Sequence, residues 1–256
     1  MWQKLLAIAF NTFREAIRNR VLHAVIVLSF VLVLSSLAIG ELSVENNARV
    51  IRNMGMTFLN FTVVFVSIFS GVSLLQIELQ RKTIYTIVTK SVSREMVIVG
   101  KFMGLVGTLL CVQLIVSLVL LGIILMRGEN LPLSLIQGLL LMFFEGVIVA
   151  GVATLFSSFS TPILSGVLTF GIFVLGRLRA DLYLYAEKMD QETLAMLIKS
   201  LGVVIPDLVL LRTDLEVAYE ISLSWSYVGY SVAYSALYAL ICIALASFIF
   251  SRRDFV

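Results

Sequence analysis

The sequence predicts an all-α membrane protein: six transmembrane helices, an N-terminal amphipathic interfacial helix and an external helical cap between the last two spans. Two observations predict this fold class. Of the 256 residues, 60% are hydrophobic and only 14% are charged, which is typical of a multi-pass membrane protein and excludes a soluble globular domain of this length. Apolar runs of about 20 residues, long enough to cross a bilayer as helices, alternate with short charged segments. Residues 1–256 therefore form a single transmembrane domain.

Residues 1–20 predict an amphipathic helix at the membrane interface. Charged and polar side chains occupy one face, and the other face carries apolar residues at helical spacing, namely Leu6, Phe10, Phe13 and Ile17. This pattern is typical of a helix that lies in the interface, and Trp2 is its expected anchor. The segment does not resemble a cleavable signal, because its charges are spread along it and no small-residue cleavage site follows. The alternative is a cytosolic extension of the first span.

Six spans are expected at residues 21–40, 56–77, 102–126, 134–156, 162–176 and 227–250, with short external loops at 41–55 and 127–133. The fifth is short for a bilayer-crossing helix. Three glycines at helical spacing lie just before the third span and in its first turns: Gly100, Gly104 and Gly107. They would let another helix approach closely. An aromatic belt marks the outer end of the last span, formed by Trp225, Tyr227 and Tyr230.

Glu145 lies near the middle of the fourth span. A carboxylate at mid-membrane costs at least about 2.5 kcal/mol on insertion scales, so this side chain should face the bundle interior or water. Our first interpretation is a structural hydrogen-bonding residue between helices. The second is a residue that lines a translocation path, and the third is a titrating proton carrier. No second intramembrane acid or base is expected beside it, which argues against a proton relay.

The charged segment 78–101 lies between the second and third spans, and five of its seven charges are basic. This bias predicts a cytoplasmic loop. A short apolar segment at 83–88 is followed by Ser93, which is suited to cap a helix that begins near Arg94. Two readings are open: a solvated basic loop, or a docking element for a soluble partner.

Residues 177–226 are too polar to span the membrane and too apolar to extend freely into water. We therefore expect an external cap of short helices, including an amphipathic one at 190–201. With this topology, eleven of the 19 basic residues and about four of the 16 acidic residues lie on the cytoplasmic side. Both termini are therefore expected in the cytoplasm.

The charged segment also carries a resemblance to a known family. It reads Glu78-x-x-Arg81-Lys82-Thr83-Ile84-Tyr85, then Ser91-Val92-Ser93-Arg94, then Gly100-Lys101. This order resembles the cytoplasmic loop of type-2 (exporter-like) ABC transporter permeases, although Ser91 stands where that family usually has proline. The chain end, Arg252-Arg253-Asp254-Phe255, resembles the same family.

The resemblance implies a type-2 ABC permease fold in a prokaryotic cytoplasmic (inner) membrane, with a second permease copy and two copies of a cytoplasmic ABC ATPase. ATP and Mg²⁺ would bind to that ATPase, and no cofactor is expected on this chain. Some family members act on a periplasmic or extracellular partner, for which 177–226 would be the surface. Membrane lipid is a further expected contact. The implied ATPase-coupling residues are Glu78, Arg81, Lys82, Thr83, Tyr85, Ser93, Arg94 and Lys101.

The chain itself is not expected to be an enzyme. It has no G-x-x-x-x-G-K-[ST] phosphate loop and no H-E-x-x-H or G-x-S-x-G motif. His23 is the single histidine, and Cys111 and Cys242 lie within apolar runs, so we expect neither a metal site nor a disulfide framework. No nucleic-acid partner is expected. The rival functions are an ion-gradient-driven secondary transporter and a non-transporting membrane scaffold.

Overall fold

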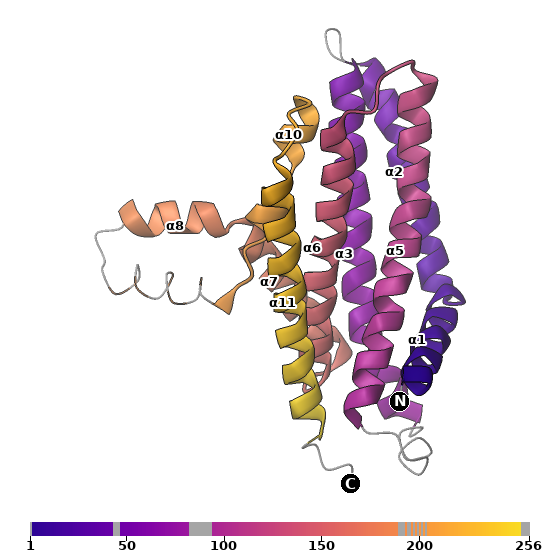
Figure 1. The fold of residues 1–256 in the computed structure, drawn as a ribbon, viewed down its shortest axis with the longest axis vertical. Coiled ribbons are helices and arrows are strands. Elements are labelled where there is room, and N and C mark those ends of the chain that lie inside the picture. The colour runs from indigo at the N-terminus through magenta and orange to yellow at the C-terminus, as the bar shows by residue number, and fades with distance from the viewer. Residues whose placement is uncertain are drawn as a thin grey trace.

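The computed structural model describes residues 2–42, 47–81, 94–188 and 204–251, with isolated positions between 193 and 202, and gives only the backbone of 75–81, Arg94 and Glu187. Every regular element in these ranges is helical, and the long helices form one bundle (Figure 1). The elements are α1 (Trp2–Ile17), α2 (Arg20–Glu41), α3 (Asn47–Arg81), α5 (Arg94–Met126), α6 (Leu133–Ser157), α7 (Pro162–Arg177), α8 (Arg179–Lys188), η1 (Val209–Leu211), α10 (Asp214–Ala218) and α11 (Trp225–Ser251).

Five of these helices are long and apolar enough to cross a membrane: α2, α3, α5, α6 and α11. A sixth crossing exists only if α7 and α8 together count as one broken span, because their axes meet at 64°. The expected all-helical membrane class is therefore confirmed. The fifth span differs from the other five, since α7 ends at Arg177 and Leu178 leaves the helical region with φ −91° and ψ 4°.

The central helix of the bundle is α6, which packs against α3, α5, α7 and α11. Gly146 on α6 permits the close approach of two of these neighbours. A Cβ atom placed there would lie 2.6 Å from a methyl group of Val63 on α3 and 2.8 Å from one of Leu109 on α5. The absence of a side chain at this position therefore determines how tightly α3, α5 and α6 pack.

The prediction of a loop at 41–55 is wrong over most of that length, because α3 already begins at Asn47. The helix extends beyond the apolar run because its polar residues find partners. Arg52 is buried and forms an ion pair with Glu220 at 2.6 Å, and the Arg49 guanidinium lies 4.3 Å from the centre of the Tyr219 ring. Tertiary contacts thus stabilise a helical turn that hydropathy alone would end.

The segment expected as a loop at 78–101 is also shorter than predicted. The backbone of α3 is helical to Arg81, and α5 begins at Arg94, so the connection is reduced to residues 82–93. The start of α5 directly follows Ser93, the residue predicted to cap it, although Ser93 itself lies outside the described residues.

Ion pairs join the connections at the end of the bundle that carries α10. Arg127, after α5, pairs with Glu41 at the end of α2. Arg52 on α3 pairs with Glu220, and it also lies 3.6 Å from Glu129 in the turn between α5 and α6. The three segments expected outside the membrane, 41–55, 127–133 and 177–226, therefore have residues that meet at the same end of the bundle.

Two described elements of the expected external cap are α8 and α10. In Figure 1, α8 projects sideways from the bundle part-way along its length, whereas α10 lies near the upper end. The amphipathic helix expected at 190–201 falls almost wholly outside the described residues.

Candidate functional site

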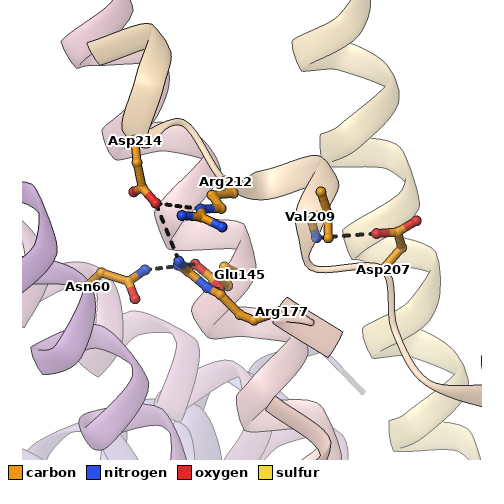
Figure 2. A network of polar contacts seen from close by, with 7 residues as sticks. All are labelled: Asn60, Glu145, Arg177, Asp207, Val209, Arg212 and Asp214. Carbon is orange, nitrogen blue, oxygen red and sulfur yellow. Dashed lines mark hydrogen bonds and ion pairs between the residues drawn. The ribbon is translucent and has the colours of Figure 1, made fainter. Parts of the chain in front are cut away.

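Glu145 is the middle residue of α6, about 18 Å along the helix from either end. Its side chain is only 1% exposed, and Figure 2 shows that it faces Arg177 and Asn60. Arg177 donates two hydrogen bonds to it, from Nε to Oε1 and from Nη2 to Oε2, both 2.9 Å long. Asn60 donates a third, from Nδ2 to Oε2 at 2.7 Å. The carboxylate therefore binds a guanidinium through both oxygens, the geometry that charge-assisted pairs favour.

Three helices supply this centre. Asn60 comes from α3, Glu145 from α6 and Arg177 from the last residue of α7. The end of α7 can reach Glu145 because the turn after Ser157 is tight. Pro162, in the first turn of α7, is suited to start the helix at once, and sixteen residues then bring Arg177 to the depth of Glu145.

The network continues outward from Arg177 to α10. Arg177 Nη1 lies 3.8 Å from Oδ2 of Asp214, the first residue of α10, and the same oxygen accepts a 2.6 Å hydrogen bond from Arg212 Nε. Exposure rises along this series of alternating charges, from 1% at Glu145 to 53% at Arg212. A path of paired charges therefore leads from the bundle interior to its surface (Figure 2).

The segment before α10 is tied to the bundle beside this network. Asp207 accepts a hydrogen bond from the amide of Val209 at 3.2 Å and lies 3.6 Å from Arg179 of α8. The Asp207 amide donates a 2.8 Å bond to the hydroxyl of Tyr234 on α11. Residues 207–214 are thus held by α7, α8 and α11 together.

This geometry corrects one sequence-based statement. From the sequence we expected no second intramembrane acid or base beside Glu145 and placed Arg177 in the external cap, but Arg177 reaches into the bundle and pairs with Glu145. The available signal was the position of Arg177 directly after a short span. The three hydrogen bonds that Glu145 accepts from Arg177 and Asn60 agree with the first interpretation, a structural residue between helices.

Lys101 occupies a second buried position, between α3 and α5. The residue is 8% exposed, and Nζ donates a 3.1 Å hydrogen bond to the carbonyl oxygen of Leu74. It borders a small cavity that is also lined by Glu15 of α1 and by Ser70 and Ser73 of α3. The ammonium group therefore links α3 and α5, the two helices that flank residues 82–93, and it lies in the interior of the protein and not on its surface.

The other expected coupling residues fall partly or wholly outside the described side chains. Lys82, Thr83, Tyr85 and Ser93 belong to 82–93, which the structure does not describe, and for Glu78, Arg81 and Arg94 it gives helical backbone only. The structure does place these three backbones at the two edges of that segment.

No described group of three or more His, Cys, Asp or Glu side chains is arranged to hold a metal ion. Comparison of the sequence with protein-family models finds no match, and no curated protein matches it either.

Proposed function

We propose that the chain is the transmembrane permease subunit of an ATP-driven transporter of the type-2 ABC class. One observation carries the proposal: the two helices that flank residues 82–93 are the longest in the bundle among those described, with 35 residues in α3 and 33 in α5. At about 1.5 Å per residue each is about 50 Å long, well beyond the ~30 Å hydrocarbon layer. A force applied at 82–93 would therefore act on two helices, α3 and α5, that extend along the whole bundle.

The energy would come from a separate cytoplasmic ATPase that binds ATP and Mg²⁺ and docks on 82–93, including Thr83 and Tyr85. Closure of an ATPase dimer would displace this segment, and α3 and α5 would move together because Lys101 joins them through Leu74. Such movement shifts the bundle between two states only if each state presents a different docking surface to the ATPase.

The buried network gives this movement a route to the opposite end. Asn60 on α3 is bonded to Glu145, and Arg177 connects Glu145 to the broken span and to α10. Displacement of α3 would thus change the position of α7 and of the residues before α11. In this proposal the chain works with a second permease copy in a prokaryotic cytoplasmic membrane, exporting a substrate or acting on an external partner through 177–226.

The test is to purify the chain from its native membrane and identify its companions, then to assay ATP hydrolysis and transport together. We expect an ABC ATPase in equal amount. Tyr85→Asp and Arg94→Glu should each leave membrane insertion intact but separate ATP hydrolysis from transport.

Arg20→Glu is the matched control, since it makes the same charge reversal on the same expected membrane face at the exposed first residue of α2. Normal coupled transport in both loop variants would contradict the proposal. A chain that purifies without any ATPase and transports in response to an ion gradient would identify a secondary transporter instead.

A further inference from the structure

The N-terminal helix α1 has two different faces. One packs on α5 at the expected glycine stripe. A Cβ atom at Gly104 would meet the carbonyl oxygen of Ala9 and lie 2.8 Å from Cβ of Thr12, and one at Gly100 would lie 3.0 Å from Ile8. The two backbones are therefore in close contact, and α1 is seated on the first turns of the helix that follows residues 82–93.

The other face of α1 is apolar and uncovered in the described structure. Trp2, Leu6 and Phe10 follow one another at intervals of four residues, and each is between 57 and 77% exposed. This spacing places them in one stripe along the helix. None of the three belongs to a hydrophobic core cluster of the described residues, so the stripe is open to a partner.

Basic side chains lie on the exposed polar face of α1, next to this stripe. Lys4, Arg14 and Arg18 are all exposed, and the Arg14 guanidinium lies 5.2 Å from the centre of the Phe10 ring. The single acid of α1, Glu15, is exposed as well and lines the cavity near Lys101. Three exposed basic side chains and one exposed acid therefore give α1 an excess of positive charge beside its apolar stripe.

The expected depth of α1 in the membrane is consistent with a lipid partner. The 22 residues of α2 extend for about 33 Å, close to the ~30 Å thickness of the hydrocarbon layer. If α2 fills that layer, its first residue, Arg20, lies at one boundary, and α1 lies in the adjoining headgroup region. Exposed aromatic and aliphatic side chains beside arginine and lysine are suited to that region when its lipids are anionic.

We propose that α1 binds the anionic lipid surface of the membrane face on which it lies. Through its contact with Gly100 and Gly104, here called the glycine seat, α1 passes the effect of this binding to the start of α5. The first half of the proposal concerns the uncovered stripe, and the second concerns Gly100 and Gly104. Neither half depends on an ATPase partner, so both are tested on the purified chain.

The binding test uses Trp2 fluorescence, because the chain has two tryptophans and Trp225→Phe leaves only Trp2. The variant is reconstituted in phosphatidylcholine vesicles that contain phosphatidylglycerol, with bromine on the acyl chains of one lipid or the other. Brominated phosphatidylglycerol should quench Trp2 at least about twofold more than brominated phosphatidylcholine at equal mole fraction. The preference should disappear in 0.5 M salt and in the triple variant Lys4→Gln, Arg14→Gln, Arg18→Gln.

Three exposed residues are changed in that variant, so the fold should survive. The control is Trp2→Phe, in which Trp225 reports ordinary lipid contact at the opposite end of the bundle. Equal quenching of Trp2 by both lipids would overturn the proposal. Shielding of Trp2 from both would also overturn it and would identify a protein surface as the occupant of the stripe.

The transmission test compares hydrogen exchange of residues 95–104 in pure phosphatidylcholine and in vesicles with phosphatidylglycerol. The unmodified chain should exchange more slowly with the anionic lipid, whereas Gly104→Leu should show no difference, because its side chain displaces α1. Gly122→Leu is the matched control, since a Cβ there meets nothing within 4 Å. The same lipid response in Gly104→Leu as in the unmodified chain would overturn transmission through the seat.

Discussion

Arg177 Nε lies 2.9 Å from Oε1 of Glu145, so the last residue of α7 is bound to the middle residue of the central helix. This pair explains how α7 can end inside the bundle. The polar end of a short helix is matched by a buried carboxylate, and neither charge is left alone in an apolar environment. The pair also links α7 to α3 through Asn60.

The first prediction concerns that pair. Arg177→Leu should lower the free energy of unfolding by about 3–5 kcal/mol, because it leaves the buried Glu145 carboxyl without its guanidinium partner. The double variant Glu145→Leu, Arg177→Leu should recover most of this loss. Chemical unfolding in mixed micelles measures both, and Arg212→Gln is the control, with an expected cost below about 1 kcal/mol at its exposed site. A double variant as unstable as the single one would contradict the pairing.

The second prediction concerns the joint between α3 and α6. Asn60→Leu removes one hydrogen bond to a charged group and should cost about 1.5–3 kcal/mol. Asn60→Asp should cost more, since it places a second carboxylate beside Glu145. Thr62→Val, which removes the 2.7 Å bond from Thr62 to Ser29 on α2, is the matched change on the same helix, with an expected cost of about 0.5–1.5 kcal/mol. An Asn60→Asp variant as stable as Asn60→Leu would rule out this arrangement.

The third prediction separates two glycines. Gly146→Ala should destabilise the bundle by about 1–3 kcal/mol, because the added Cβ overpacks against Val63 and Leu109. Gly166→Ala should be neutral or stabilising by up to about 1 kcal/mol, since a Cβ there meets nothing within 4 Å and alanine favours the helix. Opposite signs in one unfolding series would support the packing of α3, α5 and α6. Equal effects would not be compatible with it.

The fourth prediction concerns the end of the bundle that carries α10. Arg52→Gln breaks the pairs with Glu220 and Glu129 and should raise hydrogen exchange at residues 217–224 by about tenfold, a change of 1.4 kcal/mol. Arg49→Gln, one turn away, removes only the contact with the Tyr219 ring and should change exchange by less than about threefold. Unchanged exchange in Arg52→Gln would mean that α3 does not stabilise this connection.

Several features of the fold could be predicted from the sequence. The apolar runs identified each long helix, and the glycine stripe at Gly100 and Gly104 indicated a close helix contact that the structure confirms with α1 as the partner. The start of α3 could not be predicted from hydropathy. Arg52 is a charged residue, and its burial in the helix is compensated by the ion pair with Glu220, which is distant in sequence. The break after Arg177 was likewise visible only as a short span.

The sequence by itself determined the helical membrane class, the order of the spans and the unusual position of Glu145, because these follow from hydropathy and charge along the chain. Tertiary structure alone decided that Arg177 is the partner of Glu145 and that α1 is the partner of the glycine stripe. Those choices depend on how far each helix rises and on which of its faces meets a neighbour. Residues 32 positions apart in sequence meet here because α6 and α7 run side by side from a common turn, a relation that no local pattern contains.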